Sequence, residues 1–265
     1  MSYELKKKRQ HRLGFGSLFT NNKYFFPMSN KSFQFKEFNI HQDKTAMKVG
    51  MDGVLLGAWV ELNSDMNKAL DIGTGTGLIA LQIAQRSDFE TIDALEIEPN
   101  AYEQAVENFE NSDWSDRLFC YHASLQEFTI EIDEKYDLVI SNPPFYNDTF
   151  KEVEQKRATA RHTKTLSFTE LLSATAILLN PNGSCAFIIP FHEEKEFLII
   201  ANESNLYPNR ITRVRGNLKS KIKRSLLQLS FVKTKLIYNE LAIEIDRHVY
   251  TDAYKNMVRD FYSNI

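Results

Sequence analysis

Cysteine is scarce in this chain, which has only Cys120 and Cys185 among its 265 residues. Both lie in apolar runs typical of buried strands, so we expect reduced packing residues rather than a disulfide or a metal site. Long apolar runs are missing as well. No stretch approaches the roughly 20 apolar residues of a membrane span, and the basic N-terminus is not followed by the apolar segment of a secretion signal. We therefore expect a cytoplasmic monomer that binds neither a membrane nor a metal ion.

Acidic residues are absent from two long segments. Residues Leu5 to Lys36 contain eight Lys or Arg and no acid, and Ser204 to Asn239 contain nine Lys or Arg and no acid. The remaining 197 residues hold all 35 acids against 15 bases. Two basic segments on an otherwise acidic chain indicate a polyanionic partner, because phosphate binding depends on local positive potential. A solvated basic face is the alternative.

Apolar runs and helical patterns alternate through most of the chain. Strands separated by helices predict βαβ units and a parallel sheet with helices on both faces, hence an α/β fold. We expect strands over residues 68–72, 91–97, 117–123, 136–141 and 184–190, and helices over residues 77–87, 99–112, 167–179 and 192–204. In the last third, residues 210–216 and 226–238 predict two longer strands that form an antiparallel hairpin at the edge of the sheet.

A glycine-rich turn, "DIGTGTG", joins the first of these strands to its helix. Gly73, Gly75 and Gly77 remove side chains there, so that backbone N–H groups can approach a ligand. A dinucleotide-binding turn would need glycine at position 78, which is Leu78. The D-x-G-x-G-x-G pattern, which begins at Asp71, instead resembles motif I of the class I methyltransferases that use S-adenosylmethionine. The resemblance implies a Rossmann-like, seven-stranded domain with that cofactor.

Two further strand ends are candidate cofactor contacts. Glu96 ends the second strand about twenty residues after the glycines, where a carboxylate can accept hydrogen bonds from both ribose hydroxyls. An ordinary acid at a strand end is the alternative, and Glu98 is the competing carboxylate. Ala123 and Ser124 end the third strand, where members of the resembled family contact the adenine ring.

The segment "NPPF" follows the fourth strand, at the sheet edge where ligands bind in a doubly wound fold. It resembles motif IV of methyltransferases that modify amino groups. That resemblance implies that the Asn142 side-chain oxygen and the Pro143 carbonyl accept hydrogen bonds from the target amine. Pro144 stiffens the turn, and Phe145 offers a face on which a base stacks. Two fixed acceptors would localise the lone pair on the amine nitrogen and orient it toward the methyl group, so the catalysis is by orientation. A proline turn that merely ends a strand is the alternative.

Three segments together resemble the YfiC-type tRNA adenine-N6 methyltransferases: Phe33 to Trp59, NPPF, and Ala160 to Leu172. The family modifies the unpaired adenine 3′ of the anticodon in a valine tRNA, which implies tRNA as the partner. In the first segment, Gly50, Asp52 and Gly53 precede the first strand, where the loop can fold over the cofactor. Asp52 is then a candidate partner of its ammonium group, and helix capping is the alternative.

Candidate RNA contacts come from two places. Arg161 and His162 are RNA or loop-closing candidates, with a solvated helix approach as the alternative. The second basic segment supplies phosphate-binding candidates at Arg210, Arg213, Lys221 and Arg224.

We predict that residues 33–265 form the methyltransferase domain and that residues 1–32 are an N-terminal extension. Met28 stands where a family member would begin, so residues 1–27 are an extension, a misassigned start or a disordered segment. Other activities remain open. NPPF also occurs in rRNA guanine-N2 methyltransferases, and a related motif occurs in release-factor glutamine methyltransferases, which normally carry a helical domain first. A non-catalytic RNA-binding module would not need the cofactor residues.

Overall fold

The structure is a computed structural model that describes residues 31–45, 47–143 and 166–263. A short hairpin of β1 (Ser32–Gln34) and β2 (Asn39–His41) precedes α2 (Met51–Trp59). The main sheet contains β3 (Lys68–Ile72), β4 (Thr91–Glu96), β5 (Leu118–His122), β6 (Tyr136–Ser141), β7 (Leu179–Pro190), β8 (Tyr207–Asn217), β9 (Ile222–Ser230), β10 (Ile237–Asp246) and β11 (Val249–Tyr250). The described helices after α2 are α3 (Leu78–Arg86), α4 (Pro99–Glu110), α5 (Leu125–Glu131), α7 (Phe168–Leu178), the 3-10 turn η1 (Phe191–Glu193), α8 (Glu194–Glu203) and α9 (Asp252–Val258).

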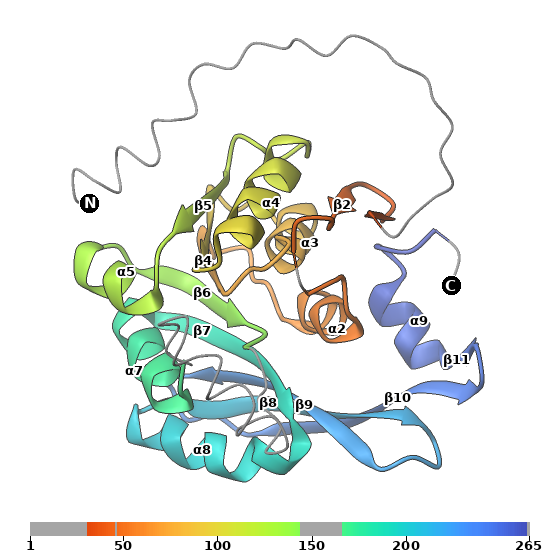
Figure 1. Cartoon of the computed structure of the whole chain (residues 1–265). Coiled ribbons are helices and arrows are strands. Elements are labelled where there is room, and N and C mark those ends of the chain that lie inside the picture. Colours follow the sequence, from red (N-terminus) through yellow and green to blue (C-terminus); the bar gives the residue numbers. More distant parts are fainter. Residues whose placement is uncertain (1–30, 46, 144–165, 264–265) are drawn as a thin grey trace, which may run out of the picture.

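The strand order of this sheet is β11-β10-β8-β9-β7-β6-β3-β4-β5 (Figure 1). Strands β3 to β7 pair in parallel with one another. β9 runs antiparallel to both β7 and β8, so β8 has the same direction as β7. The expected α/β class with a mostly parallel sheet and an antiparallel hairpin is therefore confirmed.

Two details of the expected sheet are wrong. The described residues form nine strands rather than seven in this sheet, because β10 and β11 extend it beyond the β8–β9 hairpin, which is not at the edge. The second hairpin strand ends at Ser230 rather than at Tyr238, and β10 begins at Ile237 and pairs in parallel with β8. Lys233 and Lys235 fall in the irregular segment between the two strands. Apolar residues on both sides of these lysines made the two strands look continuous.

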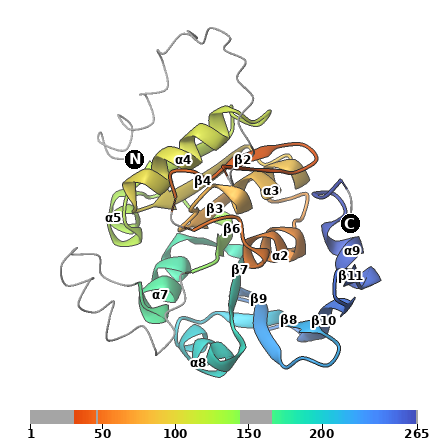
Figure 2. The ribbon, with the colours of Figure 1, turned by 45° about the vertical axis from the view of Figure 1, so that its right-hand side comes forward.

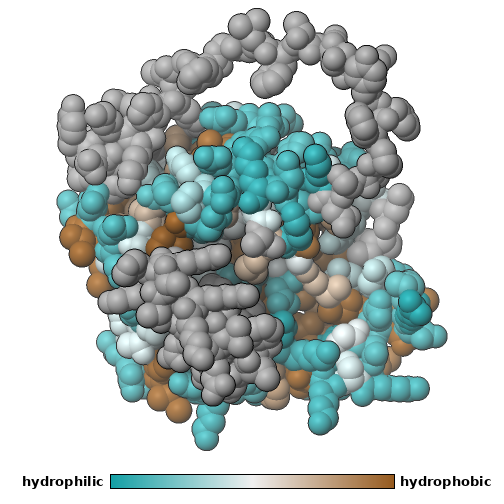
Figure 3. All heavy atoms as spheres, in the orientation of Figure 1, coloured by the Kyte–Doolittle hydropathy of each residue, from teal (hydrophilic) through white to brown (hydrophobic). Residues whose placement is uncertain are grey.

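Helices cover both faces of the sheet, and each face has its own hydrophobic core (Figure 2). Side chains from α2, α3, α4 and α9 fill the core on one face. Side chains from α5, α7 and α8 fill the core on the other face. α4 is amphipathic, with Ala101, Ala105 and Phe109 buried, and hydrophilic side chains cover its outer surface in Figure 3. This two-layer burial leaves the ends of the parallel strands as the place where polar groups gather.

The N-terminal hairpin is attached to the C-terminal end of the described chain. Phe33 and Phe35 lie 6.1 Å and 5.6 Å from the ring centroid of Tyr262, and the Lys36 N–H donates to the carbonyl of Phe261 at 2.9 Å. Residues near both ends of the described part of the chain therefore belong to the same hydrophobic core as one face of the sheet. In the part of the chain that the structure describes, no helix is long and apolar enough to cross a membrane.

Candidate cofactor and substrate site

The glycine turn follows β3 and has the backbone shape that glycine alone adopts easily. Gly73, Gly75 and Gly77 have φ values of 71°, 60° and 83°, in the left-handed region that side chains disfavour. A Cβ added at Gly73 or Gly75 would meet nothing within 4 Å, whereas one at Gly77 would lie 2.5 Å from Cε1 of Phe109. The first two glycines therefore border open space for a ligand, and the third permits close packing of the turn.

Strand register brings the predicted residues to one level of the sheet edge. Ile72 of β3 pairs with Leu95 of β4 and with Ser141 of β6. The next residue along each strand is Gly73, Glu96 or Asn142 respectively. These three residues come from segments far apart in sequence, yet they lie on adjacent strands at the carboxyl edge, where α/β sheets bind ligands.

The Glu96 carboxylate is fixed beside the glycine turn by backbone donors. The Gly75 N–H donates to Oε2 at 2.9 Å, and the N–H groups of Ile97 and Glu98 each donate to Oε1 at 2.9 Å. The residue is only 9% exposed. Glu98 has a different role, because its side chain caps α4 by accepting from the Ala101 N–H at 2.7 Å. Of the two candidate carboxylates, Glu96 is the one at the site.

Asp71 is a buried acid directly below the turn. It is 1% exposed, and the Thr74 hydroxyl donates to its Oδ2 at 2.5 Å. Its Oδ1 has no hydrogen-bond partner among the described residues. Burial raises the pKa of Asp71 to about 7, the Thr74 hydrogen bond opposes this, and the charge of Glu96 adds to it. Asp71 therefore supports the turn from beneath and titrates near neutral pH.

The Asn142 side chain lies at the same edge as Asp71 and also has an unsatisfied oxygen. Its Oδ1 is buried and accepts no hydrogen bond from any described residue. The preceding Ser141 hydroxyl donates to the carbonyl of Ile72 at 2.8 Å, which ties the end of β6 to the end of β3. An unpaired buried acceptor costs about 1–3 kcal/mol, and a bound ligand with an N–H donor would remove that cost. Pro143 is buried next to it.

Four predicted residues lie outside the residues that the structure describes: Pro144, Phe145, Arg161 and His162. The two predicted adenine contacts are described. Ala123 and Ser124 follow His122, which pairs in register with Glu96. The Ser124 hydroxyl donates to Glu127 at 2.8 Å and, as the N-cap of α5, also accepts from its N–H in a capping box. Ser124 therefore has a structural role in addition to any contact with a ligand.

The loop before the first sheet strand places Asp52 at the start of α2. Gly50 is the N-cap, and no side-chain hydrogen bond caps the helix, so Asp52 does not cap it. The Arg224 Nε instead donates to Asp52 Oδ2 at 2.8 Å. Gly53 packs closely against α3, because a Cβ there would lie 3.1 Å from Cδ2 of Leu78. The start of α2 is thus held next to the glycine turn.

The predicted phosphate-binding residues are of two kinds: arginines that contact other residues of the fold, and an exposed lysine. Arg213 binds Glu194 through two N–H groups, with its Nη2 at 2.6 Å from Oε1 and its Nε at 3.0 Å from Oε2. Arg210 lies over the Trp59 ring, 4.4 Å from its centroid, and donates to the Trp59 carbonyl. Lys221 is exposed in the turn between β8 and β9.

Sequence reasoning missed Asn108, which connects the N-terminal hairpin to the glycine turn. It is 1% exposed, its Oδ1 accepts from the His41 N–H at 2.8 Å, and its Nδ2 donates to the carbonyls of His41 and Thr76 at 2.9 Å and 2.8 Å. The available signal was a polar residue on the apolar face of α4, at helical spacing from Ala101 and Ala105.

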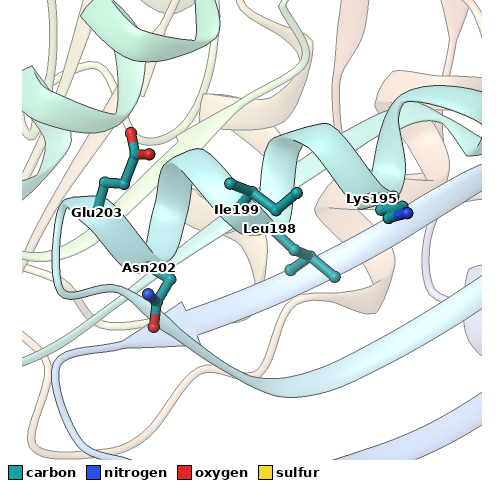
Figure 4. A pocket seen from close by; sticks show the side chains of 5 residues that line it. All are labelled: Lys195, Leu198, Ile199, Asn202 and Glu203. Atoms are coloured by element: carbon teal, nitrogen blue, oxygen red, sulfur yellow. The ribbon is translucent and has the colours of Figure 1, made fainter.

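A shallow hollow of about 450 Å³ lies elsewhere, on the outer face of α8 (Figure 4). Its described lining comes from that one helix: Lys195, Leu198, Ile199, Asn202 and Glu203. None of these is a predicted site residue. Within residues 31–45, 47–143 and 166–263, no three His, Cys, Asp or Glu side chains group as a metal site requires.

Comparisons with known proteins show the family and the fold. Residues 54–200 match the methyltransferase small domain family. The crystal structure of a predicted O-methyltransferase from Agrobacterium tumefaciens is similar, with a TM-score of 0.61 at 17% sequence identity. The match covers 81% of this chain and 100% of that chain, and at this identity it shows the fold alone.

Closer relatives are proteins named tRNA1(Val) (adenine(37)-N6)-methyltransferase. The one from Christiangramia forsetii is 57% identical over 89% of this chain and 99% of its own length. The one from Flavobacterium psychrophilum is 54% identical over 87% and 98%. The expected resemblance is confirmed, and the chain belongs to the tRNA1(Val) (adenine(37)-N6)-methyltransferase family, within the methyltransferase small domain family.

Proposed function

We propose that this protein transfers a methyl group from S-adenosylmethionine to the N6 amine of the adenine 3′ of the anticodon in a valine tRNA. Membership in the family supports this activity. The observation that carries it is the buried Asn142 Oδ1, an acceptor without a described donor, on the strand beside the glycine turn. An adenine N6 amine carries two N–H groups and fits such an acceptor.

The described residues fit the cofactor. Open space borders Gly73 and Gly75, and the Glu96 carboxylate stands at the same level with its oxygens oriented by three N–H groups. We propose that Glu96 accepts hydrogen bonds from the ribose hydroxyls and that Ala123 borders the adenine ring. When bound, the cofactor supplies an electrophilic methyl group on a sulfonium.

The catalytic contribution of the chain is orientation. In an aromatic amine the nitrogen lone pair is delocalised into the ring, which makes the amine a weak nucleophile. We propose that Asn142 Oδ1 and the Pro143 carbonyl each accept one N–H of the amine, so that the lone pair points toward the methyl group. The nitrogen forms a bond to the methyl carbon as the bond of that carbon to sulfur breaks, and the methylated amine then releases one proton to water. Pro144 and Phe145 belong to the same proposal, as the rigid turn and the stacking face.

The proposed tRNA surface begins at the turn between β8 and β9. Because β8 has the direction of β7, this turn lies at the same edge of the sheet as Asn142. Lys219 and Lys221 in this turn and Lys223 at the start of β9 are exposed and are suited to phosphate contacts. Arg161 and His162 are proposed as further RNA contacts, and residues 33–265 as one catalytic domain. We further propose a monomer that acts in the cytoplasm, where tRNA is found.

The test is incubation of the protein with labelled methyl donor and unmodified valine tRNA, followed by nucleoside mass spectrometry. The expected product is N6-methyladenosine next to the anticodon. Label on a guanine N2 in RNA would show a different base specificity, and label on a release-factor glutamine would exclude RNA as the substrate. A tRNA in which that adenine is replaced by guanine is the matched control and should accept no label.

A further inference from the structure

The Arg213 side chain contacts two aromatic rings and is held in place by a buried acid. Its Cζ lies 4.8 Å from the ring centroid of Phe191 and 4.9 Å from that of Tyr238. Its Nη2 and Nε bind the Glu194 carboxylate at 2.6 Å and 3.0 Å. Glu194 is 6% exposed and also accepts a hydrogen bond from the Ser225 hydroxyl. A carboxylate bound at the edge of a guanidinium leaves its flat faces to rings, and we call Arg213, Phe191 and Tyr238 the aromatic–arginine cluster.

The cluster reaches across the sheet toward the strand of Asn142. Phe191 directly follows β7, which pairs with β6, whereas Arg213 lies on β8 and Tyr238 on β10. The register that continues from Asn142 across the sheet runs through Ile188, Leu226, Thr212 and Asn239. Tyr238 therefore stands next to the level of Asn142, four strand steps away. At about 4.8 Å per step, that separation is about 19 Å.

Tyr238 is the accessible end of the cluster. The residue is 44% exposed, although one face of its ring lies against Arg213. Because Arg213 is itself fixed by Glu194, the ring has a preferred orientation before any partner arrives. A side chain that is already ordered loses less entropy when a ligand stacks on it. An oriented, exposed ring is therefore suited to a planar ligand.

The surroundings favour an unpaired RNA base as that ligand. Lys219 and Lys221 are exposed in the turn that follows β8, the strand of Arg213. Basic groups for phosphates together with exposed rings for bases are the means by which proteins bind single-stranded RNA. A stacked strand advances about 3.4 Å per nucleotide, so a span of about 19 Å corresponds to at most about six nucleotides. The base at Tyr238 would then be close in RNA sequence to the target adenine.

We propose that Tyr238 stacks on an unpaired base of the anticodon loop while the target adenine lies at Asn142. This inference rests on the proposed function, because tRNA is the substrate there. Tyr238 is a positioning residue in this arrangement, and Arg213 orients its ring instead of binding a phosphate. An RNA held by one base alone can still turn about it, whereas a second stacked base fixes the orientation of the loop.

The test measures the affinity of RNA hairpins that carry the valine anticodon loop, by fluorescence anisotropy. Tyr238→Leu should weaken binding roughly five- to a hundredfold, and the salt dependence should stay the same because no charge is lost. Tyr238→Trp, which keeps a flat ring, should retain the affinity. Tyr207→Leu is the matched control and should bind like wild type. Tyr207 also lies against a cation, with the Lys233 Nζ 4.3 Å from its ring centroid, but it begins β8 at the opposite edge of the sheet.

Hairpins with an abasic nucleotide at each other loop position in turn identify the stacked base. At one position, loss of the base should weaken wild-type binding about as much as Tyr238→Leu does. The two changes together should then cost no more than either alone, because both remove the same contact.

Three outcomes would overturn the inference. The first is wild-type affinity in Tyr238→Leu, and the second is a loss that adds to that of the abasic nucleotide at every position. The third is a flatter salt dependence, which would show that the substitution disturbs a phosphate contact. Thermal melting and S-adenosylhomocysteine affinity check folding. If Tyr238→Leu melts early, Tyr238→Thr, which suits a strand, supplies the same comparison.

The proposed function fails by a different observation. Methylation of a base other than the adenine would refute the proposed function and leave the binding results unaffected. Hairpin binding that does not depend on Tyr238 would refute this inference and leave the methylation product unaffected.

Discussion

Replacement of Glu96 by alanine tests the centre of the proposed cofactor site. The carboxylate accepts hydrogen bonds from the N–H groups of Gly75, Ile97 and Glu98. Its proposed ligand contacts are the two ribose hydroxyls, and losing them should weaken S-adenosylhomocysteine binding by roughly 1.5–3 kcal/mol, about ten- to a hundredfold. The folded protein should also be less stable, because three backbone donors lose their acceptor.

Glu98→Ala separates these two effects. Glu98 is two residues away and caps α4 through the Ala101 N–H, so its removal should cost about 0.5–2 kcal/mol of stability without loss of a ligand contact. Isothermal calorimetry and denaturant unfolding on both variants give the comparison. The reasoning fails if Glu96→Ala binds the ligand with wild-type affinity, or if Glu98→Ala loses as much affinity as Glu96→Ala at equal stability.

Three further predictions address the substrate and the turn. Asn142→Ala should keep cofactor and tRNA affinity while turnover falls roughly a hundredfold, because the lost contact acts in the transition state; single-turnover methylation against equilibrium binding checks this, and a matching loss of tRNA affinity would contradict it. Lys219→Glu with Lys221→Glu should weaken tRNA binding and flatten its salt dependence, with S-adenosylhomocysteine affinity as the control; an unchanged salt slope would make the turn a solvated face. Since burial raises the pKa of Asp71 from 3.8 to about 7, the folded state binds a proton that the unfolded chain releases between these pH values. That contribution to the free energy of unfolding is present below the lower pKa and is lost as pH rises through the higher one, by at most about 1.4 kcal/mol per pH unit. Urea unfolding across pH 4 to 8 should show a shallower decline for Asp71→Asn than for wild type, and identical slopes would contradict the shift.

The sequence predicted best that three site candidates would lie together, because this depends only on the direction of parallel strands. Gly73, Glu96 and Asn142 each stand at or just after the end of a recognisable buried strand, and parallel strands bring their carboxyl ends to one edge. The register Ile72–Leu95 and Ile72–Ser141 confirms that these residues lie on neighbouring strands. No knowledge of side-chain packing was needed, because strand direction alone determines the edge.

The arginine contacts could not be predicted in the same way. Composition showed a basic segment without acids, but the partners of its arginines lie elsewhere in the chain. Arg210 packs on Trp59, and Arg224 pairs with Asp52, across 151 and 172 positions. Local charge counting misses such partners, so it assigned to RNA three guanidinium groups, those of Arg210, Arg213 and Arg224, that have contacts within the fold. Lys219 and Lys221 in the β8–β9 turn carry the same charge, and the ion pairs of this region among the described residues involve Arg213, Arg215 and Arg224 instead.

Strand β10 is a second feature that was not predicted from the sequence. Its alternation of buried Leu241 and Ile243 with exposed Glu240 and half-buried Glu244 is typical of a strand with one solvated face. No strand was expected beyond Tyr238, where the second hairpin strand was expected to end. Its parallel pairing with β8 places Glu240 opposite Arg213, and the neighbouring Arg215 forms an ion pair with Glu240. The added strand therefore neutralises part of the basic segment, which shifts the positive potential toward the exposed lysines at the turn.

The strand order also arranges the proposed contacts in the order of the cofactor's chemical groups. Glu96, the proposed ribose contact, ends β4, the turn after β3 borders open space, and Asn142, the proposed contact of the target amine, follows β6. A cofactor whose ribose lies at Glu96 and whose methyl group reaches Asn142 would cross the end of β3, because β3 lies between β4 and β6. The glycine turn that follows β3 borders open space, so the strand order places room for the cofactor between its two proposed contacts.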